Sequence, residues 1–480
     1  MLVFLKFFFI FFSTVLFIPL ALSFFASKKY RRVQTKRYFL RYNIIIYHTF
    51  NSYYYQDHKT LNFNNIAPFD TFLRQKNSGR AEPRKQQKNI RKKLQQLTFL
   101  IAPFIVYVLC VFCCTVCAVS TQNQRRVVKI NVLLDDCNKQ SSTQWNFVAP
   151  KGFVISLGAC RGVKKKTKSR AITIEVKNGV LFCNDKKLTQ TICISPRGGC
   201  IQFNGVVYDG DFCIMSYKDT IVCINRVELE DYVTAVLKTE SWPGWPLEVN
   251  KVFAIACRTY AAYKKLEARR NKQPYDVKNS NVHQTYKGRH DLPVLRDAVE
   301  QTRGVVLGFE DKPILAMFDC CCGGIIPAHI ADFDFSKVPY LARTYACTYC
   351  KQSSLYSWQV SYEHAIFEAL VKNHKHEISR LFDIHIMQKD KAGLVTEVRL
   401  RGPRAQVTIS GKKLYSMLKE IKSFSFDVYK KSGKIIFTGR GFGHHLGLCQ
   451  WGARQMVRDE WGYKSILRYY YPGTRFMQLI

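Results

Sequence analysis

The sequence predicts an α+β protein, in which a mixed helix and strand body follows a β-rich extension, and apolar membrane or signal segments precede both. Three observations support this fold class. Residues 127–225 alternate or run apolar between Asn-Gly, Gly-Gly and Asp-Gly turns, as strands do. Residues 229–268 carry apolar side chains at helical spacing. From there to the C-terminus strand and helix patterns mix, with no internal repeat of about 20 to 50 residues.

Two stretches near the N-terminus, residues 2–25 and 97–119, are apolar and long enough to span a bilayer. The rest of residues 1–96 is basic and lacks a clear pattern, so we expect a poorly structured region, which could reflect an over-extended gene model. The basic residues 89–94, the apolar run and the small residues near Cys117 resemble a secretion signal. We therefore expect residues 97–119 to be a signal or transmembrane segment that exports the protein to the cell envelope.

The positive charge is large and unevenly placed. The formal net charge is +38, and the chain through Arg126 holds 20 Lys and Arg against 3 Asp and Glu. Such a balance favours a polyanionic partner: nucleic acid, anionic lipid or a wall polymer. Because no nucleic-acid motif is present, we expect the cell wall and the membrane as partners and no nucleic acid. The length fits two or three domains, which we place as a β-rich domain at residues 127–226 and a mixed body at residues 227–480.

The first helix expected in the body, residues 229–240, places one carboxylate on its apolar face. The apolar residues at three- and four-residue spacing are Leu229, Tyr232, Val233, Val236 and Leu237. Glu240 is next on that face, Pro243 ends the helix, and Trp242 and Trp245 can exclude water and contact a sugar. Burial and the C-terminal helix dipole both raise a carboxyl pKa, as a general acid for glycosidic cleavage requires. The alternative is a Glu240 that turns to solvent or pairs with a lysine.

A second helix is expected after Pro246, over residues 247–268. Lys251 and Arg258 stand seven apart, two turns along one side of this helix, with small alanines near them. This side could hold an anionic or hydroxyl-rich ligand close to the backbone. A solvated charged face is the alternative.

Two segments of the chain resemble a known family. LEDYV, TESWPGWPLE and the following K..AIA.RTYA are similar to one signature of the stage II sporulation protein D (SpoIID/LytB) family, and GRGFGHHLGLCQWGARQM with ILRYYYPGT resembles the other. The resemblance covers about residues 127–480. It implies a peptidoglycan-directed protein, whose catalytic members are lytic transglycosylases acting on glycan strands without peptide stems. It also implies a catalytic role for Glu240 and functional roles for Lys251 and Arg258.

A lytic transglycosylase can use one acid twice. Glu240 would protonate the bridging oxygen and then take a proton from the C6 hydroxyl of the sugar, leaving a 1,6-anhydromuramyl end. A hydrolase needs a second carboxylate, but Glu230 and Asp231 lie at the other end of the helix and Glu248 begins the next one. We therefore predict a peptidoglycan lytic transglycosylase in cell-wall remodelling. The alternative is a non-catalytic, glycan-binding activator of a cell-wall amidase, as some family members are.

The glycine-rich signature surrounds two histidines and leads into an expected helix. Closely spaced glycines let backbone N–H groups approach a ligand, so we expect His444 and Gln450 to contact substrate. A core histidine in a glycine turn is the alternative for His444. His445 stands where family members more often have glycine, and Cys449 where serine is common.

The 18 cysteines include one dense group, residues 320–322 with Cys347 and Cys350. A C-x-x-C pair with a second cysteine group about 25 residues away has the form of a tetrahedral zinc site. Some family members bind zinc here, but Asp319 stands where they have histidine, so their ligand set does not transfer. We choose four residues as zinc ligands: Cys320, Cys322, Cys347 and Cys350. Disulfides are the alternative, which export would favour.

Overall fold

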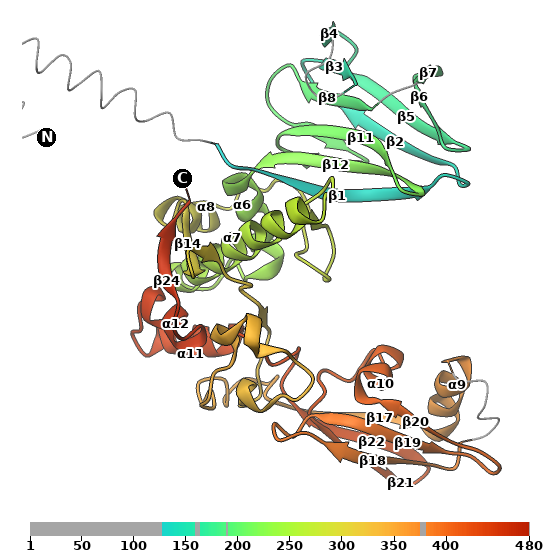
Figure 1. Ribbon diagram of the computed structural model, residues 1–480, viewed down its shortest axis with the longest axis vertical. Helices are drawn as coiled ribbons and strands as arrows, with labels where there is room; N and C mark the ends of the chain where they lie inside the picture. The colour runs from blue at the N-terminus through green and yellow to red at the C-terminus, as the bar shows by residue number, and fades with distance from the viewer. Residues whose placement is uncertain (1–126, 159–163, 189–190, 375–380, 480) are drawn as a thin grey trace, which may run out of the picture. The chain divides into compact units, whose positions relative to one another are not determined.

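The computed structural model describes residues 127–158, 164–188, 191–374 and 381–479. The apolar stretches and the basic region expected before residue 127 lie outside the described residues. In the part that is described, no helix is both long and apolar enough to cross a membrane. Helices alternate with several sheets, which confirms the α+β class for this part of the chain (Figure 1).

Residues 129–228 form strands in two sheets, as the alternating sequence predicts. The strands are β1 (Lys129–Asn138), β2 (Thr143–Val148), β3 (Phe153–Leu157), β4 (Lys164–Thr167), β5 (Ala171–Lys177), β6 (Val180–Cys183), β7 (Lys186–Leu188), β8 (Ile192–Pro196), β9 (Ile201–Phe203), β10 (Val206–Tyr208), β11 (Asp211–Tyr217) and β12 (Thr220–Glu228). One sheet has the order β13-β1-β12-β11-β8-β3-β4, where β13 is Val277–Lys278, and the other has the order β10-β9-β2-β5-β6-β7. Aromatic rings from both sheets meet between them, with the Phe147 and Phe212 centroids 5.1 Å apart.

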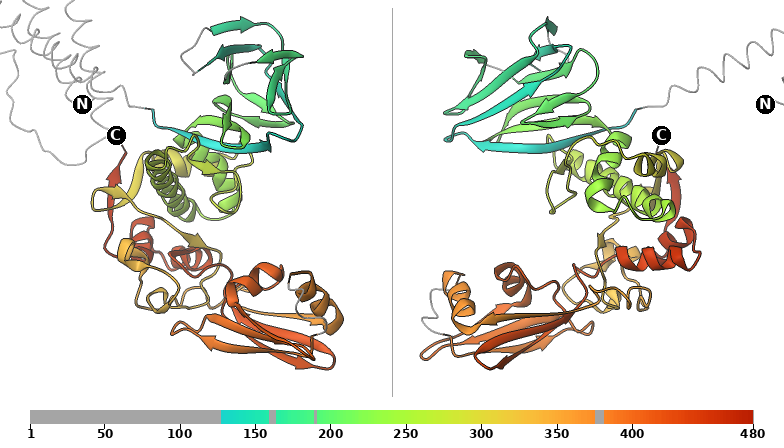
Figure 2. Two further views of the ribbon diagram at one scale, coloured as in Figure 1. Left: turned by 45° about the vertical axis from the view of Figure 1, so that its right-hand side comes forward. Right: turned by 180° about the vertical axis from the view of Figure 1, so that it is seen from behind.

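Three helices follow these strands. Helix α6 (Leu229–Glu240) begins where β12 ends, α7 (Leu247–Arg270) packs against it, and α8 (Pro293–Gln301) packs against both. Strands β14 (Val305–Phe309) and β15 (Lys312–Pro313) form a hairpin, and the C-terminal strand β24 (Arg475–Gln478) pairs with β14 (Figure 2). One continuous apolar core runs from Ile130 of β1 to Tyr471, so the β-rich part and the helices share a core.

Residues 357–440 build a second core, which the sequence analysis did not separate from the body. Their elements are β17 (Ser357–Glu363), α9 (His364–His374), β18 (Asp383–Lys389), β19 (Val395–Arg401), β20 (Gln406–Ser410), α10 (Gly411–Met417), β21 (Phe426–Lys431) and β22 (Lys434–Arg440). The sheets β17-β22-β21 and β18-β19-β20 bury an apolar cluster around Phe367, Val398 and Phe437. Figures 1 and 2 show α9 and α10 on the same side of these sheets.

The segments that carry the cysteines and the glycine signature meet through a short parallel pairing. Strand β16 (Phe318–Asp319) pairs with β23 (Leu448–Cys449), so the residues after β16 lie beside those before α11 (Gln450–Arg458). Helix α12 (Tyr463–Tyr470) follows α11. Short 3-10 turns lie between the cysteine groups: η1 (Pro327–His329), η2 (Phe335–Lys337) and η3 (Pro339–Leu341).

Candidate functional site

Glu240 is the last residue of α6, as the sequence predicts, and its carboxyl group is partly buried. The backbone N–H of Thr285 donates to Glu240 Oε1 at 2.6 Å. Burial raises the pKa of Glu240 above its usual value, and the Thr285 hydrogen bond acts in the opposite direction. The carboxyl group therefore holds its proton more tightly than an exposed glutamic acid.

The segment that carries Thr285 is fixed to the helices at several points. Tyr232 donates its hydroxyl to Gln284 Oε1 at 2.9 Å, and the Gln284 amide donates to the carbonyl of Cys257 on α7. The Thr239 hydroxyl donates to the Thr285 carbonyl at 2.5 Å. The position of the Thr285 N–H relative to Glu240 is thus set by buried contacts. Sequence reasoning missed this segment because its contribution is a backbone group, which has no residue signature.

The glycine signature reaches Glu240 through Gln450. The Gln450 amide donates to the backbone carbonyl of Glu240 at 2.9 Å. The last carbonyls of a helix have no partner within the helix, and this bond supplies one. Gln450 therefore joins the start of α11 to the end of α6, while the predicted substrate contact by Gln450 stays a prediction.

Tryptophan side chains form a surface that follows Glu240 in the chain. Trp242 is 58% exposed, and its ring stacks on that of Trp245, which is 9% exposed, with centroids 6.3 Å apart. Trp451 packs edge-on to Trp245 at 5.7 Å, and the guanidinium of Arg454 lies 4.9 Å from the Trp451 ring centroid. We call Trp242, Trp245 and Trp451 the tryptophan surface. The sequence pointed to its first two members, whereas Trp451 and Arg454 join only through the fold.

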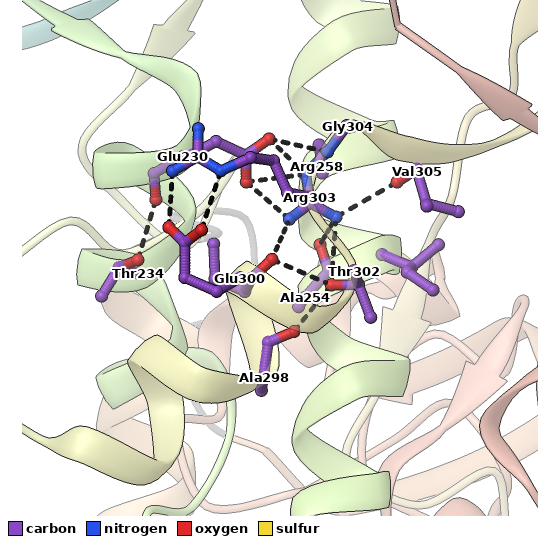
Figure 3. A network of polar contacts seen from close by, with 12 residues as sticks. Glu230, Thr234, Ala254, Arg258, Ala298, Glu300, Thr302, Arg303, Gly304 and Val305 are labelled. Carbon is purple, nitrogen blue, oxygen red and sulfur yellow. Dashed lines mark hydrogen bonds and ion pairs between the residues drawn. The ribbon is translucent and has the colours of Figure 1, made fainter. Parts of the chain in front are cut away.

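Arg258 is fully buried, which differs from the predicted contact with substrate (Figure 3). Its Nε and Nη2 donate to the carboxylate of Glu230, with the shortest bond 2.6 Å, and Nη1 donates to the Val305 carbonyl at 3.1 Å. Glu230 also accepts the N–H of Gly304 at 3.0 Å. The pair joins the start of α6 to the middle of α7 and to the segment before β14, and the predicted substrate contact by Arg258 stays a prediction.

Replacing Glu230 by glutamine is expected to lower the free energy of unfolding by about 3–5 kcal/mol, because the Arg258 guanidinium would stay buried without a counter-ion. Chemical denaturation of the purified protein measures this. Glu300→Gln is the matched control, since the Glu300–Arg303 pair lies in the same network but is half-exposed, and its loss should cost at most about 1 kcal/mol. Equal losses for both variants would contradict the structural role of Glu230.

Lys251 forms an ion pair with Glu248. Its ammonium group lies 2.6 Å from Glu248 Oε1 and over the ring of Tyr463 at 5.7 Å. Glu248 also accepts the N–H of Tyr463 at 3.1 Å. These contacts join the first turns of α7 and α12. The structure therefore does not bring Lys251 and Arg258 together as one ligand-binding side.

Of the two histidines of the glycine signature, His445 is buried and His444 is partly exposed. Burial lowers the pKa of His444 to about 4, and its Nδ1 accepts the N–H of Leu446 at 3.1 Å. His445 has φ +67°, a left-handed backbone conformation that glycine adopts without strain, which explains why family members more often have glycine there. The buried carboxylate of Asp319 accepts the His445 N–H at 2.7 Å. Two of the three departures from the family pattern, Asp319 and His445, thus contact each other.

Four buried cysteines could hold a metal ion, and they differ from the predicted set by one residue. The Sγ atoms of Cys322, Cys347, Cys350 and Cys449 all lie within 4.8 Å of one another. Cys320 lies outside this four-cysteine cluster, whereas Cys322 of the same Cys-Cys-Cys run belongs to it and the thiol of Cys321 interacts with Cys350 and Cys449. Cys449 takes the place of Cys320 because the pairing of β16 with β23 brings the two segments together.

The cluster has the dimensions of a tetrahedral sulfur site. Four Sγ atoms around zinc at about 2.3 Å are about 3.8 Å apart. Cys322 Sγ and Cys350 Sγ are 3.7 Å apart, far beyond the disulfide bond length of about 2.05 Å. Cys449 Sγ accepts the N–H groups of Cys322 and Gly452 at 3.3 Å each, and it caps the start of α11, where the helix dipole stabilises negative charge. These residues fit a structural zinc ion.

Glu240 lines neither of two cavities in the described part of the chain. The larger, about 540 Å³, lies at the end of α7 and is described below. The smaller, about 170 Å³, lies beside the start of α6 and is lined by Glu230, Asp231 and His290 among others.

Comparisons with known proteins match the body of the chain. The family described as "Stage II sporulation protein" matches residues 217–309, and a domain of unknown function matches residues 341–447, which include the whole of the second core. An uncharacterised protein of Brachyspira hyodysenteriae is 32% identical over 279 residues, which is 56% of this chain and 72% of that protein.

Two further relatives carry functional names. Stage II sporulation protein D of Bacillus amyloliquefaciens is 25% identical over 276 residues, covering 54% of this chain and 76% of the relative. An amidase enhancer of Bacillus subtilis is 25% identical over 285 residues, covering 50% of this chain and 39% of the relative. The matched segments include Glu240 and the helices around it. The chain belongs to the stage II sporulation protein D (SpoIID/LytB) family, a family of cell-wall remodelling proteins.

Proposed function

We propose that this protein is a lytic transglycosylase that cleaves peptide-free glycan strands of peptidoglycan outside the cytoplasm, with Glu240 as its acid and base. The observation that carries the proposal is the carboxyl group of Glu240 at the end of α6. It is partly buried, its pKa is raised, and it lies next in the chain to an exposed tryptophan surface. A protonated carboxylic acid beside aromatic rings suits the cleavage of a sugar–sugar bond.

The hydrogen bond from Thr285 distinguishes the two carboxyl oxygens. Because Oε1 accepts the Thr285 N–H, Oε2 is the oxygen that carries the proton. In the first step this proton moves to the bridging oxygen, and the bond from that oxygen to the anomeric carbon breaks. In the second step the C6 hydroxyl oxygen attacks the anomeric carbon and its proton returns to Glu240. The acid is regenerated and the product ends in a 1,6-anhydro sugar.

The electrostatic surroundings of Glu240 support a one-acid mechanism. The shift of its pKa comes from burial and from Thr285, with no second carboxylate contributing within the described residues. Asp231 lies nine residues earlier on α6, about 13 Å along the helix axis. Glycosidases that add water hold two carboxyl groups about 5–10 Å apart. Glu230 and Glu248, the other acids nearby in sequence, are occupied by Arg258 and Lys251.

The tryptophan surface is the proposed contact for the glycan. Trp242 presents most of its ring to solvent, and Trp245 beneath it fixes its position through the turn closed by the Trp245 N–H and the Trp242 carbonyl at 2.9 Å. The apolar faces of sugar rings pack on such aromatic faces. The proposed roles of His444 and Gln450 as substrate contacts remain part of this proposal, whereas Lys251 and Arg258 support the fold around the acid.

The proposed metal of the four-cysteine cluster is a structural zinc ion. All four ligands are sulfur and all are buried, so no position is left for substrate or water, as in structural sites. The ion would fix the segment after β16 to the start of α11. That start also carries Gln450, which bonds the carbonyl of Glu240, so the metal would support the acid from a distance without taking part in the chemistry.

A second function is favoured by one observation: one relative is named an amidase enhancer. In that case the protein would bind glycan and stimulate a cell-wall amidase without cleaving a sugar–sugar bond. Incubating the purified full chain with peptide-free glycan strands and analysing the products by mass spectrometry separates the two. Anhydro ends, lighter by one water than hydrolysed ends, support the enzyme. No product alone, but faster amidase turnover in a mixture, supports the activator.

The pH dependence of cleavage follows from the raised pKa of Glu240. The acid is active when protonated, so kcat/KM should fall as pH rises through its pKa in the free enzyme. Because burial raises that pKa, the fall should occur at a higher pH than the value of about 4.3 for an exposed glutamic acid. A pH–rate profile on peptide-free glycan measures this limb. A limb at or below the value for an exposed acid would contradict the proposed state of Glu240.

A further inference from the structure

The larger cavity, about 540 Å³, lies far along α7 from the candidate acid. It forms where strand β1, the turn between β11 and β12, and the segment after α7 meet. Glu240 is linked to Cys257 of α7 through Thr285 and its neighbour Gln284, and the cavity begins at Asn271, fourteen residues after Cys257. At 1.5 Å per residue this is about 20 Å along the helix. The cavity is therefore separate from the proposed catalytic site.

The inner part of the cavity is apolar and aromatic. Leu133, Val222 and Tyr275 belong to a small buried cluster distinct from the main core, and the ring of Tyr217 packs against it. Tyr217 and Tyr275 meet edge to face, with centroids 6.3 Å apart at 81°. Tyr217 is only partly buried, so part of its ring borders the cavity. We call this space the tyrosine cavity.

The outer part of the cavity is polar and has spare hydrogen-bonding capacity. The carboxylates of Asp136 and Asp219 and the side-chain amides of Asn271 and Gln273 line it. In the described part of the chain, none of these four side chains makes a hydrogen bond or an ion pair with another residue. An aromatic interior with converging donors and acceptors, in a volume between about 300 and 1,000 Å³, is the usual form of a small-ligand site.

The turn at the cavity edge is held in place. Lys218 has φ +52°, a left-handed conformation that is uncommon for a lysine, and its ammonium group lies 5.4 Å from the Tyr217 ring centroid. Lys139 fixes the turn by donating its ammonium group to the Lys218 carbonyl at 2.5 Å and its N–H to the Asp219 carbonyl at 3.1 Å. A positive φ is the usual geometry of a two-residue hairpin turn, such as this one between β11 and β12, and the bonds from Lys139 hold the turn in place.

We propose that the tyrosine cavity is a second saccharide site, which binds a short segment of an N-acetylated glycan strand. This rests on the proposed function for the identity of the ligand. A sugar offers an apolar face to Tyr217, hydroxyl groups to the two carboxylates, and acetamido groups to the amides of Asn271 and Gln273. The cavity is lined by the carboxylates of Asp136 and Asp219 and by one ammonium group, that of Lys218. This excess of negative charge disfavours the binding of a phosphate or another polyanion. Because the site is remote from Glu240, it would hold long strands on the protein and leave short ones unaffected.

Binding is tested with the full chain carrying Glu240→Gln, so that no turnover is needed, and a tetrasaccharide of β-1,4-linked N-acetylglucosamine as the probe. Adding Tyr217→Ala should weaken binding about tenfold, while Tyr217→Phe keeps the ring and should bind like the parent. Tyr429→Ala is the control, since Tyr429 is an exposed tyrosine of the second core. Asp219→Asn, at an exposed position, gives a second variant with little risk to folding and should also weaken binding.

Three outcomes would overturn the proposal: equal affinity for Tyr217→Ala and its parent, an equal loss in Tyr429→Ala, or binding of Ca²⁺ with no saccharide binding. In the background with an intact Glu240, Tyr217→Ala should raise KM for long peptide-free strands and leave kcat and the cleavage of short oligosaccharides unchanged. If the protein cleaves no glycan at all, the proposed enzyme function fails while the binding result still decides the saccharide site.

Discussion

Replacing Glu240 by glutamine is expected to reduce glycan cleavage at least about 100-fold, the usual contribution of a general acid, because an amide cannot donate the proton that the leaving oxygen needs. Glutamine has nearly the same shape and keeps an oxygen that can accept the Thr285 N–H. The loss should therefore appear in kcat, with little change in KM. Release of anhydro-ended products from peptide-free strands measures it.

The same substitution should leave the fold intact and raise its stability slightly near neutral pH. A raised pKa means that the folded state binds the Glu240 proton more tightly than the unfolded chain does. The stability from this binding is complete below the unfolded pKa and is lost as pH rises through the folded pKa. Glutamine carries no charge to bury, so it avoids that loss. Thermal unfolding at two pH values checks the sign.

Glu248→Gln is the matched control for this experiment. Glu248 lies eight residues later and is bonded to Lys251 and to the Tyr463 N–H, so its substitution changes one carboxylate without touching the acid. It should cleave at nearly the parental rate. A Glu240→Gln protein that cleaves as fast as its parent, or a Glu248→Gln protein that loses activity equally, would remove Glu240 from the proposed mechanism.

The sequence predicted the position of the acid because one periodic pattern carries it. The apolar residues of α6 define a face, Glu240 is next on that face, and Pro243 stops the helix beyond it. Likewise the alternating pattern before residue 228 predicted a β-rich region, which the structure arranges as two sheets. These features depend on residues near one another in the chain, where spacing determines which side chains share a face.

The spacing of residues along a helix does not show which other parts of the chain pack against each face of that helix. Lys251 and Arg258 do lie two turns apart on α7, but Arg258 is enclosed by α6, α8 and the segment before β14, because Glu230 comes to it from 28 residues away. The same limit applies to Thr285, whose N–H binds Glu240 from 45 residues away. In both cases the partner depends on tertiary packing, which a local pattern does not contain.

The cysteines also show that a local pattern does not reveal a partner that is distant in the sequence. The Cys-x-x-Cys pair is local, so Cys347 and Cys350 were predictable, and Cys322 follows from the nearby run. Cys449 lies 99 residues after Cys350, beyond the second core, and only the pairing of β16 with β23 brings it to the others. Its position just before the predicted helix was visible in the sequence, but nothing there showed that this helix start faces the cluster.

Replacing Cys449 by serine is expected to abolish stoichiometric metal binding and to destabilise the protein by several kcal/mol. It removes one of four ligands, and the remaining sulfurs would stay buried at spacings that suit a cation. It also removes the cap of α11, since Cys449 Sγ accepts the Gly452 N–H. The melting temperature should fall by about 10 °C or more. Elemental analysis by mass spectrometry gives the zinc content per chain, and calorimetry gives the melting temperature.

Cys320→Ser is the control that distinguishes the four-cysteine cluster from the set expected on spacing. Cys320 is next but one to Cys322 and partly buried, yet it lies outside the cluster, so its serine variant should keep both metal and stability. Loss of metal in both variants would mean that the ion is held differently from this structure. If the parent instead contains no metal and its cluster cysteines resist alkylation until reduced, the site is a pair of disulfides. In that case the Sγ atoms of Cys322 and Cys350, which are 3.7 Å apart here, must move closer to form a bond. The Gln450 amide must then bond the Glu240 carbonyl without a metal ion that fixes the start of α11.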